Sequence, residues 1–229
     1  MKIENLHSWD VTPKEAAEIQ KKLAGKITLS FKNSPPRIVA GADISFSKGS
    51  DNAYAGIVLL SFPSLELIHE YGLSGPLKFP YVPGLLSFRE APLLLKLLRH
   101  VNPAPDLLFF DGQGLAHPRR FGLACHMGLL LDRPAIGCAK SKLIGNFSEP
   151  GRKKGSSAEL RDSNGDLLGT ALRSREGCKP IFVSPGHKID TPASVRYTLE
   201  CCTRYRIPEP TRRAHLLVNK LRQEAQERD

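Results

Sequence analysis

The sequence lacks the features of a disulfide-rich, secreted or membrane-spanning protein. Its 229 residues include only five cysteines, an odd number without CxxC spacing, so reduced thiols are expected rather than a disulfide framework or a zinc site. No apolar stretch approaches the roughly 20 residues that cross a bilayer, and the N-terminus has no apolar signal region. These absences predict a soluble, cytoplasmic protein.

Motifs for common small ligands are missing as well. No GxGxxG follows the first expected strand, and GxxxxGK[ST] does not occur, which argues against a dinucleotide fold and a P-loop. No histidines occur at the HxxxH spacing of a helical metal site. His126, which would lie within a helix beside Cys125 and Met127, is expected to be a core residue.

What the chain does have is positive charge, unevenly distributed. The formal net charge is +10, and residues 140–229 hold 18 Lys and Arg against 11 Asp and Glu, whereas residues 1–139 hold 15 against 12. A basic half joined to a balanced half is typical of a protein that binds a phosphate backbone. A basic protein without such a partner is an equally good interpretation of the charge alone.

Apolar periodicity predicts a single α/β domain over residues 1–229. Strands are expected at 37–46, 53–62, 65–73, 107–111, 134–140, 166–173 and 180–184. Helices are expected after an N-cap at Thr12, after a loop that reaches at least Gly84 and then to about Leu98, and at 120–131, 192–203 (with Thr191 as N-cap) and 210–226. Three consecutive strands followed by alternating helices and strands favour a ribonuclease H-like arrangement, a central mixed β-sheet flanked by helices.

Two carboxylates stand out because they interrupt or end apolar strands. Asp43 lies within VAGADISF and Asp111 follows LLFF. A carboxylate among buried residues is costly unless it is paired, hydrogen-bonded or bound to a metal, and hard oxygen ligands suit Mg²⁺ or Mn²⁺. The alternatives are that Asp111-Gly112 only starts a turn and that Asp43 is a hydrogen-bonded core carboxylate.

Glu90 is a third candidate carboxylate. Ser87 and Glu90 have the spacing of a capping box, but Pro92 would then lie inside the helix, where its ring and missing N–H are unfavourable. A helix that begins nearer Glu90 accommodates Pro92 and leaves the carboxylate at the mouth of the helix. Both interpretations stay open.

The segment 79–84 (FPYVPG) is the least ordinary loop. Prolines on both sides stiffen it and hold aromatic side chains outward, as an intercalating wedge requires. The alternative is that these aromatic side chains are buried and hold the loop against the core. Lys140 could be a solvated lysine or could stabilise charge on a phosphate, and His117 could contact phosphate or lie at the surface.

Six segments between about residues 37 and 220 together resemble the endonuclease V family, repair nucleases that cut near deaminated purines. They are VAGADIS (39–45), YVPGLLSFREAP (81–92), LFFDGQGLAHPRRFGLACHMG (108–128), PAIGCAKSK (134–142), SPGH (184–187) and TRRAHLLVN (211–219). The resemblance implies a ribonuclease H-like fold and a Mg²⁺-dependent hydrolase, with Mn²⁺ as a substitute.

By matching positions, the resemblance also assigns roles to residues. Asp43 and Asp111 would bind the metal, Glu90 would support it, and Lys140 and His215 would assist at the phosphate. The wedge would comprise Tyr81 with its neighbours Pro80, Val82 and Gly84, and His117 would contact DNA. Gly112, Leu85 and Gly122 would line a pocket for the extruded base.

The implied activity is nicking of DNA at the second phosphodiester bond 3′ to deoxyinosine and related deaminated bases. The expected partner is double-stranded DNA that contains such a base, with single-stranded DNA or RNA as further candidates, bound by a monomer and without a membrane. Alternatives are an inosine-directed ribonuclease, a lesion-binding protein that does not cut, and a resolvase specific for branched DNA.

Overall fold

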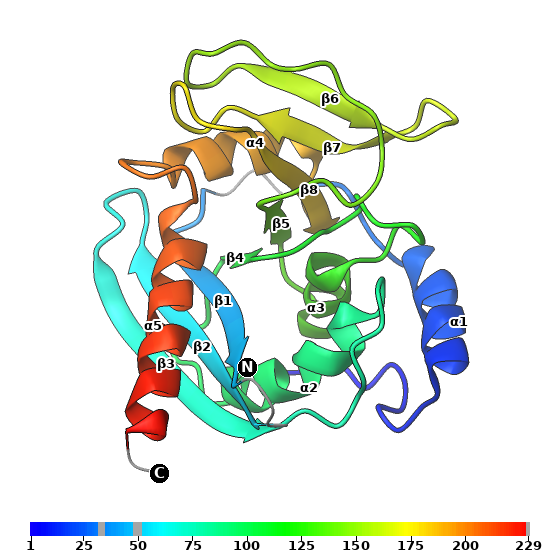
Figure 1. Ribbon diagram of the computed structural model, residues 1–229, viewed down its shortest axis with the longest axis vertical. Helices are drawn as coiled ribbons and strands as arrows, with labels where there is room; N and C mark the ends of the chain where they lie inside the picture. Colours follow the sequence, from blue (N-terminus) through cyan, green and yellow to red (C-terminus); the bar gives the residue numbers. More distant parts are fainter. Residues whose placement is uncertain (32–34, 48–51, 228–229) are drawn as a thin grey trace.

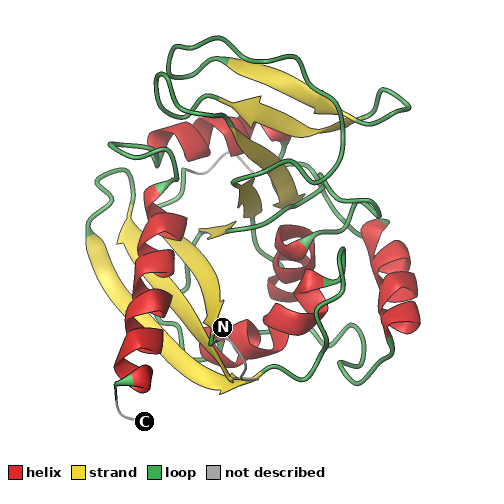
Figure 2. Cartoon of the chain, in the orientation of Figure 1, coloured by secondary structure: helices red, strands yellow, loops and turns green. Residues whose placement is uncertain are grey.

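The computed structural model describes residues 1–31, 35–47 and 52–227, in which five helices and eight strands form a layered α/β fold (Figures 1 and 2). The helices are α1 (Pro13–Ala24), α2 (Leu86–Leu98), α3 (Leu123–Leu131), α4 (Thr191–Glu200) and α5 (Glu209–Gln226). The strands are β1 (Ile38–Phe46), β2 (Asn52–Ser61), β3 (Leu67–Pro76), β4 (Leu107–Phe110), β5 (Ala135–Ala139), β6 (Ser157–Arg161), β7 (Leu167–Leu172) and β8 (Ile181–His187). Within these residues, no helix combines the length and the apolar character needed to cross a membrane.

All described strands belong to one mixed sheet with the order β3-β2-β1-β4-β5-β8-β7-β6. The first three strands form an antiparallel meander, and β4 and β5 add to β1 in parallel. The strands β8, β7 and β6 complete the sheet with antiparallel pairs. Because β1, β4 and β5 are parallel neighbours, their carboxyl ends lie at the same edge of the sheet, where the chemistry of the fold is expected.

Helices cover both faces of the sheet, and alternate residues of β1 serve different cores. Ala40 packs in the cluster formed with α2 and α3, whereas Val39 packs in the cluster formed with α4 and α5. Figure 1 shows α5 lying along the face of β1 and β2. By the same alternation, Gly41 and Asp43 lie on the α5 side of β1.

The structure corrects the prediction for α2. The helix begins at Leu86, so Pro92 lies inside it and Glu90 is a buried residue of the helix rather than a group at its mouth. The capping box is not formed either, because the N-cap is Leu85 and no side chain caps the helix. The free energy gained by burying the apolar face of α2 against the sheet outweighs the cost of the hydrogen bond that proline cannot donate.

The starts of two helices and the presence of one strand also differ from the prediction. The helix α3 begins at Leu123 rather than residue 120, since Arg120 has a left-handed φ of 53°. The N-cap of α4 is Asp190, whose carboxylate accepts from the Ala193 N–H, and Thr191 is already helical. The strand β6 (Ser157–Arg161) was not predicted, because it is short and mostly polar at the edge of the sheet.

The absence of a side chain at Gly41 sets how closely α5 approaches the sheet. A Cβ on Gly41 would lie 1.9 Å from the Pro210 carbonyl oxygen in the first turn of α5. Gly56 on β2 meets the same helix, where a Cβ would lie 2.7 Å from a methyl carbon of Val218. The glycines therefore position α5, which carries His215.

We expect Gly41→Ala to lower the free energy of unfolding by about 1–3 kcal/mol, the usual cost of overpacking, because backbone cannot yield as a flexible side chain can. Chemical denaturation monitored by circular dichroism measures this. Gly25→Ala is the matched control, since nothing lies within 4 Å of a Cβ there and its φ is −68°. Equal stability of the two variants would contradict the role of Gly41.

Candidate metal centre

Asp43 and Asp111 meet where the parallel pairing of β1 with β4 ends. Ala42 on β1 is paired with Phe110 on β4, and the two aspartates are the next residue of each chain segment. His215 reaches the same point from α5. One potential ligand atom of each of the three residues lies within 4.8 Å of the others. The sequence predicted the two aspartates as a pair, and the structure brings them together.

Each aspartate also has a basic neighbour. Nδ1 of His215 lies 2.8 Å from Oδ2 of Asp43, and the Lys140 ammonium lies 2.5 Å from Oδ2 of Asp111. The Ile44 backbone N–H donates to Oδ1 of Asp43 at 2.9 Å. Lys140 follows β5 directly, so three adjacent parallel strands and one helix contribute to the centre.

Burial and neighbouring charges change the acidity of Glu90 and Asp43. Burial in the first place, and then the charges of Asp43 and Asp111, raise the pKa of Glu90 to about 8, while the charge of Arg89 opposes the shift. Burial and the Asp111 charge also raise the pKa of Asp43, while its contact with His215 lowers it. Near neutral pH, Glu90 therefore holds a proton in the metal-free protein.

This donor set fits a divalent cation. Two carboxylates supply hard oxygen ligands, His215 adds an imidazole, and a bound cation would relieve the repulsion among the acidic groups. Glu90 is close enough for its pKa to respond to both aspartates, which places it beside the centre.

A cavity of about 370 Å³ opens beside Asp111 and Lys140. Of the three residues expected to line a pocket, Gly112 and Gly122 lie in its wall, whereas Leu85 is buried in a cluster with Ala16, Phe79 and Phe88 and Leu86 lines the cavity instead. Gly122 is needed here, because a Cβ would lie 2.3 Å from the Gln113 carbonyl oxygen. Lys142 and Leu143 line the cavity too.

The loop 79–84 forms another wall and is fixed at both ends. The Phe79 carbonyl accepts a hydrogen bond of 2.6 Å from Arg89. The Gly84 carbonyl accepts from Gln20, Arg119 and His117, at 3.1, 2.7 and 2.9 Å. Between these anchors, the Tyr81 side chain is 68% exposed. The loop therefore presents Tyr81 on a rigid support.

His117 does not lie at the surface, which was one of the two positions expected for it. It is buried, and burial lowers its pKa to about 4, so its neutral ring supports the loop through Gly84. Gln20 and Arg119 donate to the same carbonyl, and neither was predicted from the sequence. Gln20 shares the buried face of α1 with Ala16 and Leu23, and a polar residue at such a position was the available signal.

A model of the family described as Endonuclease V matches residues 21–216 of this sequence. The chain belongs to the endonuclease V family. The endonuclease V of Methanothrix thermoacetophila is 49% identical over 220 residues, which cover 96% of each chain.

Solved structures of the family have the same architecture. The crystal structure of endonuclease V from Bacillus subtilis matches with a TM-score of 0.94 at 31% identity and covers 100% of both chains. Endonuclease V from Ciona intestinalis, in complex with a 23mer DNA containing an inosine followed by a ribo-adenosine, matches with a TM-score of 0.83 at 31% identity over 94% of this chain and 100% of that chain. The predicted ribonuclease H-like fold is confirmed, and the family is one of nucleases that depend on a divalent metal.

We expect the affinity for a divalent cation to rise with pH up to about 8, because the cation favours the ionised form of Glu90 and so displaces its proton. Each proton released contributes up to about tenfold in affinity per pH unit. Calorimetric titration in buffers of different ionisation enthalpy measures both the affinity and the proton release. In Glu90→Gln the pH dependence should become shallower, and an unchanged dependence would contradict the assignment.

Proposed function

We propose that this protein is a DNA repair endonuclease that nicks DNA at the second phosphodiester bond 3′ to deoxyinosine and related deaminated bases. The observation that carries the proposal is the arrangement of a cavity of about 370 Å³ directly beside the candidate metal centre, with Asp111 and Lys140 in the wall of that cavity. Membership in the endonuclease V family and the inosine-containing DNA bound to the Ciona relative support it.

Asp43 and Asp111 are the proposed ligands of Mg²⁺, for which Mn²⁺ is a substitute, and His215 completes the group. When bound, the cation would supply charge neutralisation at the scissile phosphate and activation of the attacking water. Lys140, which pairs with Asp111, is positioned to stabilise negative charge that develops on the phosphate. Glu90 accepts a proton at this site when its carboxylate is ionised.

The cavity is the proposed receptor for the extruded base. Oε1 of Gln113, in its wall, is the only buried side-chain polar atom of the described chain without a hydrogen bond. Hypoxanthine carries N–H donors that suit such an acceptor. The backbone at Gly112 and Gly122 lets the chain approach a planar base closely.

Tyr81, with Pro80 and Val82, is the proposed wedge that opens the duplex. Its exposed ring stands on a loop fixed by Arg89 at one end and by three donors at Gly84 at the other. A rigid aromatic side chain takes the place of the extruded base at little conformational cost, and extrusion costs least where pairing is already weak.

The proposed partner is double-stranded DNA with a deaminated base. The protein is proposed to bind it as a monomer of one domain. The net charge of +10 supports affinity for a polyanion that falls with salt. The ribo-adenosine in the DNA bound to the Ciona relative supports an inosine-directed ribonuclease as a second candidate. Comparing cleavage with ribose and deoxyribose at inosine and its 3′ neighbour separates the two.

We expect Asp43→Asn to lower nicking of a deoxyinosine duplex by roughly a hundredfold or more, because the amide keeps the shape but loses the ligand charge. Binding of the duplex should persist in a filter or anisotropy assay. Asp166→Asn is the matched control, since Asp166 pairs only with Arg120, at an exposed position. Full activity of Asp43→Asn would contradict the proposed metal centre.

We expect Tyr81→Ala to lower the preference for inosine over adenosine sites about tenfold or more, because stacking on an aromatic ring contributes about 1–3 kcal/mol per base. Competition between the two duplexes measures the preference. Tyr81→Phe keeps the ring and should keep the preference. If the alanine variant discriminates as well as the phenylalanine variant, Tyr81 is not the wedge.

A further inference from the structure

A second cavity lies on the other side of the loop 79–84. Its volume is about 790 Å³, and it runs between α2 and the N-terminal segment that precedes α1. The loop separates the two cavities, and different residues of the loop line each of them. Tyr81, Val82, Pro83 and Gly84 face the first cavity, whereas Phe79 and Pro80 face the second. We call the second cavity the α2 groove.

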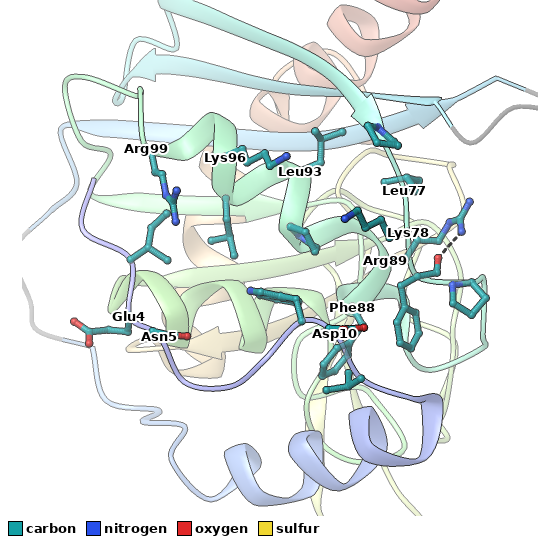
Figure 3. Close-up of a pocket in the computed structure, with 18 residues that line it drawn as sticks. Glu4, Asn5, Asp10, Leu77, Lys78, Phe88, Arg89, Leu93, Lys96 and Arg99 are labelled. Carbon is teal, nitrogen blue, oxygen red and sulfur yellow. Dashed lines mark hydrogen bonds between the residues drawn. The ribbon is translucent and has the colours of Figure 1, made fainter.

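One wall of the α2 groove is a row of cations. Figure 3 shows Arg99, Lys96, Lys78 and Arg89 following one another along α2 and the segment beside it. Arg89 and Arg99 are ten positions apart, which corresponds to about 15 Å along a helix. In the part of the chain that the structure describes, no ion pair involves any of the four. Lys78, Lys96 and Arg99 are exposed, and the acidic residues that line the groove are Glu4, which pairs with Lys2, and Asp10.

The opposite wall offers an aromatic ring and hydrogen-bonding groups. Trp9 lines the groove and stacks on His126, with ring centroids 5.3 Å apart and an interplanar angle of 24°. Asn5 and Asp10 lie on the same side (Figure 3). A row of cations facing an aromatic ring is the combination that binds single-stranded nucleic acid, with phosphates on the basic wall and bases toward the aromatic one.

We propose that the α2 groove binds the undamaged strand opposite the lesion, as a single-stranded segment released by the wedge. The inference rests on the proposed function, because a wedge that drives one strand toward the first cavity must leave the other strand on its far side. Arg89 connects the two regions, since it belongs to the row of cations and donates to the Phe79 carbonyl at the base of the loop. About 15 Å of basic wall suits several nucleotides, at about 3.4 Å of rise per nucleotide.

The test reverses two charges in the groove and changes only the opposite strand of the DNA. Lys96→Glu combined with Arg99→Glu should weaken binding of an intact deoxyinosine duplex by about tenfold or more, and should reduce the dependence of log affinity on log salt by about 1.5. Binding of a duplex with a short gap opposite the deoxyinosine, or of the single-stranded deoxyinosine oligonucleotide, should not change. Lys26→Glu with Arg37→Glu makes the same charge change at exposed residues that line neither cavity and should leave all three affinities unaltered.

Trp9 gives a direct signal from the groove, because it is the only tryptophan of the chain. Its fluorescence should change when the wild-type protein binds the intact deoxyinosine duplex. The change should be smaller with the gapped duplex and with the charge-reversed variant at saturating DNA.

The results separate this inference from the proposed function. If the wild type neither binds nor nicks any deoxyinosine DNA preferentially, the proposed function fails and the groove inference fails with it. If the wild type nicks deoxyinosine duplexes but the charge reversal weakens intact and gapped duplexes equally, or weakens neither, the groove does not hold the opposite strand and the proposed function stands. A selective loss with the intact duplex, together with the Trp9 signal, establishes the groove.

Discussion

Mutual repulsion of carboxyl groups is the constraint around which this molecule is organised. Asp43 lies within β1, Asp111 follows the parallel neighbour β4, and Glu90 lies buried on α2, where its pKa responds to both aspartates. Burial and repulsion both disfavour the ionised form of Glu90, and together they raise its pKa to about 8. A proton on Glu90, Lys140 beside Asp111 and His215 beside Asp43 together offset the repulsion in the metal-free protein. A divalent cation would replace that proton.

The parts of the site that could be found from the sequence are residues that break the pattern of their immediate neighbours. A carboxylate in an apolar strand and an aromatic residue between prolines both break the surrounding pattern, and so Asp43, Asp111 and Tyr81 could be found. The helices and strands followed from apolar periodicity, and only the polar edge strand β6 was missed. These features are local, because each depends on a few neighbouring residues.

The remainder of the site depends on tertiary contacts that no local pattern contains. The start of α2 was misplaced because burial of its apolar face outweighs the preference of Pro92 for a helix start. Gln20 and Arg119 act on the Gly84 carbonyl from distant segments of the chain. The family resemblance gave His215 a role at the phosphate, but its contact with Asp43 was not predicted, since Gly41 and the first turn of α5 set that contact.

The contact between Asp43 and His215 joins residues that are 172 positions apart. A ribosome releases the chain from its N-terminus onward, so the three carboxyl groups emerge well before α5. Until α5 covers β1, the centre lacks its imidazole and the α5 face of the sheet is bare. A growing chain that has emerged only as far as β8 therefore carries all three carboxyl groups without the imidazole, and the centre stays incomplete until α5 has been made and has packed on β1.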